Sequence, residues 1–387
     1  MNKNISTIKS AAISTKFAYI DIAKAIGILA VVFAHINVEG GIYRTLYSFH
    51  IPLFFILAGM TFKGESQSIH EFMDKKVRRL LLPYLVYSLI TFAWYALVEV
   101  KMPEFTALAK GQTTIGAFME IFLARGSVDF LQHNPALWFI PCLFVTELIY
   151  FGLSKCKKAV KITGVLLLGA IGCLFTMPFI HGFFRELPWQ TGVAFVALPF
   201  LLFGEALTKK VGLDGLQNIV LKKKWISCLL IIVGIAAVIA LTWANGLFLP
   251  IEAKGHISMG SKHLGNFGIF YVNAILGSMA VIALSILLAH LLRERIELHK
   301  SGLVWLGERS LPIMAIHYPV KRRMVVIVAQ AINAWHLAEV NGGFTTYTSS
   351  HLLPSFIAFI FTMVITVIIT IAAESFTKKA NLPGKRK

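Results

Sequence analysis

Acidic residues are scarce in this sequence, which has 19 Asp and Glu against 37 Lys and Arg among 387 residues. Charged residues of both signs make up only 14% of the chain, whereas hydrophobic residues make up 57%. A soluble globular domain carries about a quarter of its residues as charges. The shortage of charge therefore excludes an ordinary soluble enzyme and indicates a protein embedded in a membrane.

Cysteine is also rare, and the spacing of the four cysteines matches no metal-ligand pattern, so we expect reduced packing residues and no metal site. No internal repeat, low-complexity tract or soluble domain is visible. The first apolar segment lacks an A-x-A cleavage site and contains Asp21 and Lys24, which argues against a removable signal peptide. We expect one transmembrane domain over residues 1–387, with a short cytoplasmic tail at 377–387.

Apolar stretches of about 20 residues recur along the whole chain, and each is long enough to cross about 30 Å of hydrocarbon. They predict an all-α integral membrane protein with a bundle of about ten transmembrane helices. The predicted spans are 17–37, 43–62, 77–100, 136–154, 161–178, 190–207, 225–244, 267–291, 303–320 and 352–376.

Basic residues gather after the second, fourth and sixth predicted spans and again in the C-terminal tail. Short loops rich in Lys and Arg remain on the cytoplasmic side of a membrane. This distribution predicts that both termini are cytoplasmic. As a separate expectation, we take the membrane to be the inner membrane of a bacterium. The distribution of basic residues also explains the net charge of +18 without a nucleic-acid partner.

Two segments do not fit the regular pattern of spans. Residues 115–123 are apolar but too short to cross, and predict an interfacial helix. In segment 303–335, the basic residues Lys321, Arg322 and Arg323 interrupt the apolar run. Because lipid penalises buried charge, we predict that the ninth span ends near Pro319, with the basic residues at the outer interface and residues 324–335 lying along it.

The first predicted span contains Asp21, Lys24 and His35. Ionisable groups inside a span normally face protein or a watery cavity. Lys24 and His35 are eleven positions apart, which is about three helical turns or ~16 Å of axial rise, so both point the same way. This stripe suggests a site with a cation and a general base. The alternative is that Asp21 and Lys24 form an i, i+3 pair that only neutralises itself.

Five motifs in order along the chain resemble the membrane-bound acyltransferase-3 superfamily, in its fucose 4-O-acetylase-like branch. They lie at residues 19–28 with His35, 49–59, 76–84, 136–141 and 306–319. One departure is Ala58, where family members usually have serine. The resemblance implies acyl transfer from cytoplasmic acyl-CoA, with acetyl-CoA the default donor, to a sugar hydroxyl of a cell-surface glycan or lipid-linked saccharide. No permanently bound cofactor is expected.

A hydroxyl acceptor must lose its proton as it attacks a thioester, and an imidazole with a pKa near 6.5 suits this general-base role. His35 is our candidate base. Glu39, one turn further on, is a candidate to orient it, with a plain surface charge as the alternative. His317 is expected at a depth similar to His35, where it would assist proton transfer or bind acceptor. His50 is a candidate for binding the acceptor.

Donor binding is assigned to cations near the cytoplasmic side. Lys24 is expected to hold a phosphate or amide of CoA, while Lys76 and Arg79 match the family motif and would bind CoA phosphates. Arg309 is a further candidate. Three other residues complete the expected substrate site, with packing or charge neutralisation as their alternative roles: Asp21, Trp138 and Glu147.

Two other functions remain open from the sequence. Ten spans with buried charges also describe an exporter of polysaccharide or lipid-linked sugar, although the paired halves common among transporters are not visible. A non-catalytic partner of a glycan synthase would keep the motifs as scaffold only.

Overall fold

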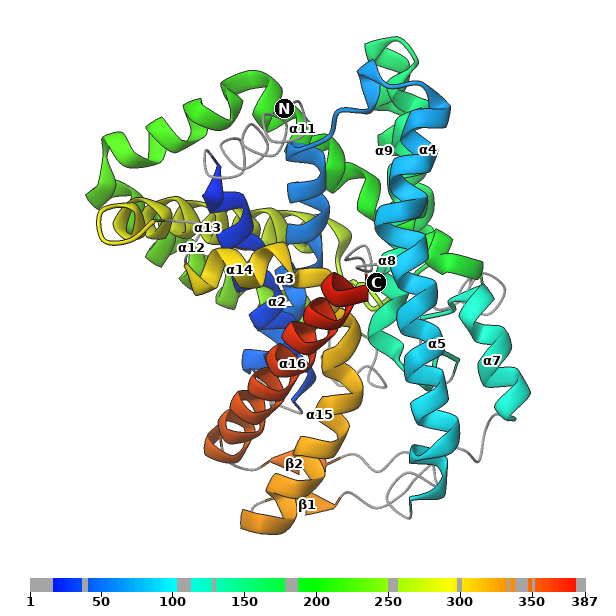
Figure 1. Ribbon diagram of the computed structural model, residues 1–387. Helices are drawn as coiled ribbons and strands as arrows, with labels where there is room; N and C mark the ends of the chain where they lie inside the picture. The colour runs from blue at the N-terminus through cyan, green and yellow to red at the C-terminus, as the bar shows by residue number, and fades with distance from the viewer. Residues whose placement is uncertain are drawn as a thin grey trace, which may run out of the picture.

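A computed structural model describes most of the chain and shows a bundle of helices (Figure 1). The described residues are 17–36, 41–102, 113–126, 130–177, 187–249, 257–297, 301–332, 335–337, 347–349 and 352–380. The helices in chain order are α2 (Ala18–His35), α3 (Gly41–Met60), α4 (Ile69–Lys76), α5 (Leu82–Leu97), α7 (Thr114–Leu123), α8 (Phe139–Ser154), α9 (Lys158–Leu174), α11 (Thr191–Lys222), α12 (Lys224–Gly246), α13 (Phe267–Arg293), α14 (Gly302–Glu308), α15 (Ser310–Ile332) and α16 (Leu352–Ala380).

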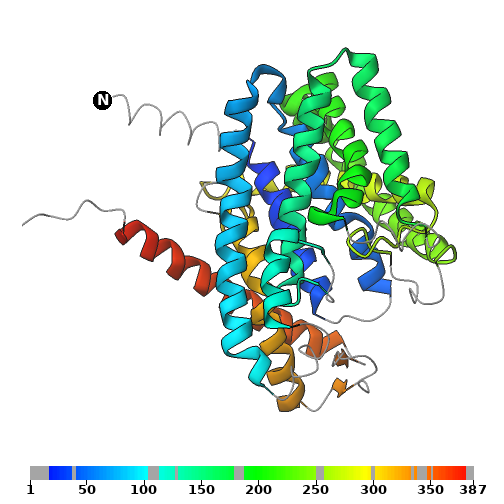
Figure 2. The same ribbon diagram turned by 90° about the vertical axis from the view of Figure 1, so that its right-hand side faces the viewer.

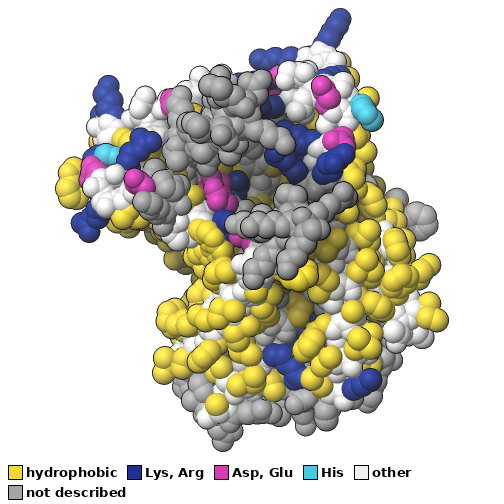
Figure 3. All heavy atoms as spheres, in the orientation of Figure 1, with side chains coloured by type: hydrophobic (Ala, Val, Ile, Leu, Met, Phe, Trp, Pro, Cys, Tyr) yellow, Lys and Arg dark blue, Asp and Glu magenta, His cyan; other side chains and the backbone are white. Residues whose placement is uncertain are grey.

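Eight segments are long and apolar enough to cross a membrane, so the predicted all-α membrane architecture is confirmed. They comprise α2, α3, the continuous α4–α5 stretch, α8, α11, α12, α13 and α16. Two of the ten predicted spans fall outside this set. One corresponds to α9, which has 17 residues, and the other is divided between α14 and α15. Figure 3 shows a broad hydrophobic belt below a rim of charged side chains.

Helices α2 and α3 lie at the centre of the bundle, with α11, α13, α14 and α15 packed around them (Figures 1 and 2). The contact between α3 and α11 depends on two glycines. A β-carbon on Gly59 would collide with the backbone of Leu201, and one on Gly204 would collide with the backbone of Ile56. Small residues allow helix backbones to approach this closely in membranes. Gly59 in the second-helix motif is thus explained by packing.

Helix α14 also packs closely against the start of α2 because a glycine lies at the contact. A β-carbon on Gly307 would collide with the backbone of Asp21. The tyrosine of the first motif also fastens α2, because the Tyr19 hydroxyl donates to the Leu213 carbonyl on α11 at 3.2 Å. The charged stripe of α2 therefore has a fixed position relative to α11 and α14.

The prediction that the ninth span ends near Pro319 is wrong. Helix α15 continues through Pro319 and the three basic residues to Ile332, and Pro319 lies inside it. The expected penalty assumed that the cations would face lipid. Instead Arg322 is only 6% exposed and pairs with the buried carboxylate of Glu99 at 2.6 Å. A protein partner, distant in the sequence, replaces the water that the cation loses.

Two smaller elements complete the fold. A short apolar helix, α7, is present where the sequence predicted an interfacial one, and the Tyr84 hydroxyl holds it by donating to the Ile121 carbonyl at 2.6 Å. Beyond α15, strands β1 (Trp335–Leu337) and β2 (Tyr347–Ser349) form a short antiparallel ribbon before α16. Helix α16 then packs against α15 (Figure 1).

Candidate active site

Two imidazoles from helices far apart in the sequence meet near the middle of the bundle. His35 closes α2 and His317 lies in the second turn of α15. The Nε2 atom of His317 lies 3.1 Å from Nδ1 of His35, and the two ring centroids are 5.1 Å apart. The sequence placed both residues at a similar depth, and the structure joins them by a hydrogen bond.

The hydrogen-bond network determines which ring nitrogen carries a proton. Nδ1 of His317 lies 2.7 Å from the Met314 carbonyl and 3.2 Å from the Ile313 carbonyl. Carbonyls only accept, so Nδ1 of His317 must donate, and its Nε2 is then the acceptor of a neutral ring. His35 therefore donates from Nδ1, and no group among the described residues hydrogen-bonds to the lone pair on its Nε2. That nitrogen is able to take a proton from a hydroxyl.

The surroundings distinguish the two rings. His317 is fully buried, whereas His35 is partly accessible. The edges of Tyr47 and Tyr318 face the His35 ring, at centroid distances of 6.1 and 5.6 Å. His35 is therefore the more accessible of the two imidazoles, and the hydrogen bond from its Nδ1 to His317 restrains its tautomer and orientation.

His50, like His35, contacts the Tyr47 ring. Its ring packs edge-on against Tyr47 at 4.8 Å, and its Nδ1 lies 2.5 Å from the Leu46 carbonyl. The side chain is almost completely buried. His50 thus supports Tyr47 in the wall of the site, and its own ring is hidden.

Lys24 forms the ion pair that the sequence allowed as an alternative. Its ammonium lies 2.9 Å from Asp21 Oδ1, one turn earlier on α2. The Lys24 side chain is still 34% exposed, against 16% for Asp21. An ammonium has three protons to donate and Asp21 engages one, so Lys24 retains donors for a further ligand.

Two other candidate cations are engaged by carboxylates. The ammonium of Lys76 lies 2.5 Å from Glu147 Oε1, and Glu147 is almost completely buried. The guanidinium of Arg309 makes a two-point contact with Glu374 on α16, at 2.7 and 3.2 Å, and lies over the Trp305 ring. Glu147 is thus placed to neutralise Lys76, and Arg309 to fasten α15 to α16.

The same end of the molecule carries cations without an acidic partner. Within the described part of the chain, no carboxylate pairs with Lys63, Lys75 or Arg79. Lys63, Lys76 and Arg79 all lie close enough to Lys75 to interact with it electrostatically. We call Lys63, Lys75 and Arg79 the basic rim. Arg79 belongs to a π-helical turn, Val77–Leu81, that joins α4 to α5.

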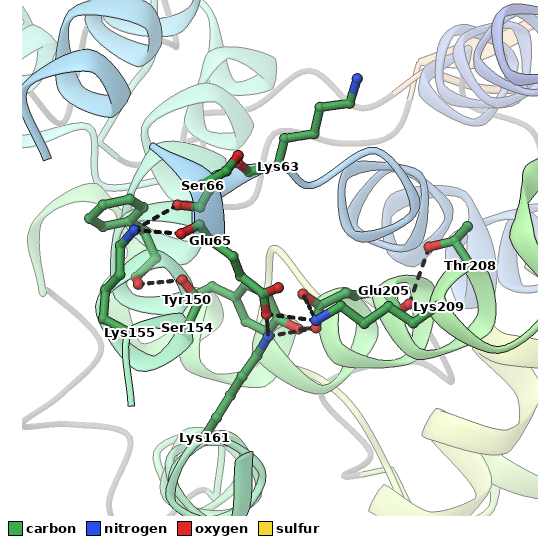
Figure 4. Close-up of polar contacts among 12 residues, drawn as sticks. Lys63, Glu65, Ser66, Tyr150, Ser154, Lys155, Lys161, Glu205, Thr208 and Lys209 are labelled. Carbon is green, nitrogen blue, oxygen red and sulfur yellow. Dashed lines mark hydrogen bonds and ion pairs between the residues drawn. The ribbon is translucent and has the colours of Figure 1, made fainter. Parts of the chain in front are cut away.

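A network of ion pairs centred on the buried Lys161 and Glu205 lies near Lys63 of the basic rim (Figure 4). Lys161 lies 2.6 Å from Glu205 Oε2 and 3.2 Å from Glu65 Oε1, and Tyr150 donates to Glu205 at 2.6 Å. Lys209 approaches both acids. The Lys63 side chain points away from this network, and none of the carboxylates drawn there pairs with its ammonium.

Comparison with known families decides what this arrangement belongs to. The model of the acyltransferase 3 family, described as an acyltransferase domain, matches residues 17–374. The chain belongs to the acyltransferase 3 family. Comparisons with curated proteins and with solved structures gave no match. The matched region contains both imidazoles, the Lys24–Asp21 pair and the basic rim of this acyltransferase.

Two further candidate residues from the sequence are Glu39 and Trp138. Glu39 lies outside the described residues. Trp138 packs its ring edge-on against Phe139, at a centroid distance of 6.1 Å. A β-carbon on Gly260 would come 2.9 Å from that indole ring. In the acyltransferase, Trp138 thus occupies a packed position between α8 and the segment around Gly260.

Sequence reasoning missed the polar groups around Arg322. Its guanidinium also donates to the Gln132 carbonyl at 2.5 Å, and Tyr95 donates to the Gln132 side chain at 2.9 Å. Burial, together with Arg322, lowers the pKa of His133 to about 3, so this imidazole is neutral. The charge of Arg322 inside an apolar run was the available signal, but its partners are about 190 to 220 positions away.

Proposed function

We propose that this acyltransferase moves an acyl group, acetyl by default, from cytoplasmic acyl-CoA to a sugar hydroxyl of a cell-surface glycan or lipid-linked saccharide. The observation that carries the proposal is the His35–His317 pair, in which a reachable imidazole has an unprotonated Nε2. A hydroxyl acceptor needs such a base, whereas simple passage of a substrate through a membrane does not. The motif resemblance favours the fucose 4-O-acetylase-like branch.

The donor route follows from charge. The phosphates of CoA cannot enter hydrocarbon, so the nucleotide remains at the cytoplasmic mouth and only the pantetheine arm extends inward. The basic rim offers three cations with no acidic partner among the described residues, and charge-assisted hydrogen bonds to phosphate are strong. Lys24 lies on the same helix as His35, about 16 Å of axial rise before it. The thioester would then reach His35.

In the proposed reaction, Nε2 of His35 removes the proton of the acceptor hydroxyl as its oxygen attacks the thioester carbonyl. His317 accepts the hydrogen bond from Nδ1 of His35 throughout, and so stabilises the imidazolium that forms. The carbon–sulfur bond then breaks, and the proton on His35 passes to the departing CoA thiolate. His317 acts on the substrate only through His35 and is a positioning residue.

Purified protein supplied with radiolabelled acetyl-CoA tests the proposal. We expect release of CoA thiol, and transfer of label into a glycan or lipid-linked saccharide fraction from cell envelopes. An exporter or a non-catalytic partner would leave acetyl-CoA intact. The mass of the modified glycan, higher by one acetyl group per acceptor unit, would identify the acceptor class.

The basic rim gives a sharper prediction about the donor. Arg79→Ala should weaken binding of a non-hydrolysable acetyl-CoA analogue by about tenfold, because a hydrogen bond to a charged group contributes ~1.5–3 kcal/mol. Arg78→Ala is the matched control, since Arg78 is the adjacent residue and its guanidinium is paired with Asp74 at 2.7 Å. Calorimetry of both variants provides the measurement.

Equal affinity of the Arg79 and Arg78 variants would move the nucleotide away from the basic rim. Lys24→Ala should also weaken binding, whereas His35→Ala should bind normally and lose turnover. Such a split separates residues that hold the donor from the residue that performs the chemistry.

A further inference from the structure

One cation of α15 differs from its neighbours. Arg322 is paired with Glu99, but within the described ranges no carboxylate lies near the ammonium of Lys321. Its Nζ atom lies 4.8 Å from the centroid of the Tyr318 ring, and the side chain is partly buried. Figure 3 shows a small group of basic side chains interrupting the hydrophobic belt over α15. Lys321 is thus a partly buried cation of α15 that has no carboxylate partner among the described residues.

The position of Lys321 relates it to the imidazole pair. Lys321 follows His317 by four residues, so both side chains lie on one face of α15. Tyr318, which Lys321 contacts, also faces the His35 ring at 5.6 Å. The ammonium lies close enough to interact electrostatically with both imidazoles. Lys321 therefore directs a positive charge toward the place where the thioester would react.

An unbalanced cation inside a membrane is costly, and ionisable groups there are normally functional. In acyl transfer, negative charge develops on the carbonyl oxygen of the thioester when the hydroxyl attacks. A positive charge fixed beside that oxygen favours the transition state over the ground state. Such stabilisation is large where water is excluded.

We propose that Lys321 stabilises the oxyanion formed on the thioester carbonyl. The inference rests on the proposed function and adds a residue that the family motifs do not single out. As the acceptor oxygen bonds to the carbonyl carbon, the π electrons move to the carbonyl oxygen, and Lys321 stabilises that negative charge. When the oxyanion collapses, the carbon–sulfur bond breaks and the thiolate takes the proton from His35.

Hydrolysis of acetyl-CoA by water passes through the same oxyanion, so the test needs no identified acceptor. CoA thiol release from acetyl-CoA alone is measured for the detergent-purified full chain. Lys321→Met should lower kcat by about 10²–10³-fold, the cost of removing one oxyanion-stabilising group, with the KM for acetyl-CoA nearly unchanged. Lys321→Arg should restore part of the rate because it restores the charge.

Arg323→Met is the matched control, because it removes the same charge from the same helix two residues further on. It should retain wild-type release. Gel-filtration profiles and melting temperatures establish that each variant is folded, and Lys321→Gln replaces the Met variant if the latter does not fold. A lower rate of CoA release in Lys321→Met or Lys321→Gln, with a wild-type rate in Arg323→Met, supports the proposed role of Lys321.

Unchanged hydrolysis in a folded Lys321→Met protein would overturn the proposed role of Lys321. If that variant also had a higher KM for an added extract of lipid-linked saccharides, Lys321 would be a ligand of an acceptor anion. If the wild type released no CoA either from acetyl-CoA alone or with the cell-envelope acceptor fraction, the proposed function would fail, and the role of Lys321 with it. CoA release that is lost in His35→Ala but kept in Lys321→Met would contradict only the proposed role of Lys321.

Discussion

Replacement of His35 by alanine is expected to lower acyl transfer by about 10²–10⁴-fold, the usual cost of losing a general base. The reason is the geometry of the imidazole pair. His317 is fully buried and its Nδ1 donates to backbone carbonyls, so it has no free nitrogen to offer a substrate. The initial rate of CoA thiol release with a saturating acceptor fraction measures the effect.

The matched control is His290→Ala, which removes an imidazole at the end of α13, where it interacts with Lys224 and Glu294. Its rate and the abundance of both variants should equal those of the wild type. If purified His35→Ala retained more than half of wild-type turnover, another group would have to be the base.

The largest expected effect on stability comes from the network in Figure 4. Lys161 and Glu205 are each 7% exposed and lie 2.6 Å apart. Lys161→Met leaves the carboxylate of Glu205 buried with Tyr150 and the more exposed Lys209 as its remaining partners. Breaking a buried pair by removing one partner costs about 3–5 kcal/mol. Denaturant unfolding in mixed micelles should reveal a loss of that order.

Lys158→Met provides the comparison, because Lys158 lies on the same helix, three residues earlier, and is exposed. The double variant Lys161→Met with Glu205→Met should recover part of the loss, since a well-packed apolar pair can replace buried charges. A Lys161→Met protein as stable as Lys158→Met would show that Lys209 alone balances Glu205.

The helical architecture could be predicted because each span carries its own signal. A run of about 20 apolar residues specifies a membrane helix without reference to the rest of the chain. The same local reasoning predicted α7 and the common depth of His35 and His317. It was wrong for α15, where the cost of Arg322 depends on Glu99, more than 200 residues earlier. Whether a charge inside an apolar run is tolerated depends on long-range partners.

The candidate site shows the same division. The Lys24–His35 stripe follows from helical periodicity within one element, and the structure keeps both residues on α2. The pairing of Lys76 with Glu147 and of Arg309 with Glu374 did not follow, because each pair joins helices whose packing no local pattern specifies. Consequently sequence reasoning treated Lys76 and Arg309 as cations free to bind a phosphate, whereas in the structure each is paired with a carboxylate.

The imidazole pair crosses a boundary between two packing units. Val31 and Val32 of α2 belong to the main hydrophobic core, whereas Ile36 packs with Val325, Val328 and Ala358 in a much smaller cluster between α15 and α16. A small apolar cluster resists local opening less than a large one. Opening of that cluster would free the end of α2 that carries His35, whereas His317, three residues after Met314 of the main core, would stay in place. In the proposed mechanism the imidazole pair thus depends on a small cooperative unit, and amide exchange in the second half of α15 and loss of turnover on warming should follow the same opening equilibrium.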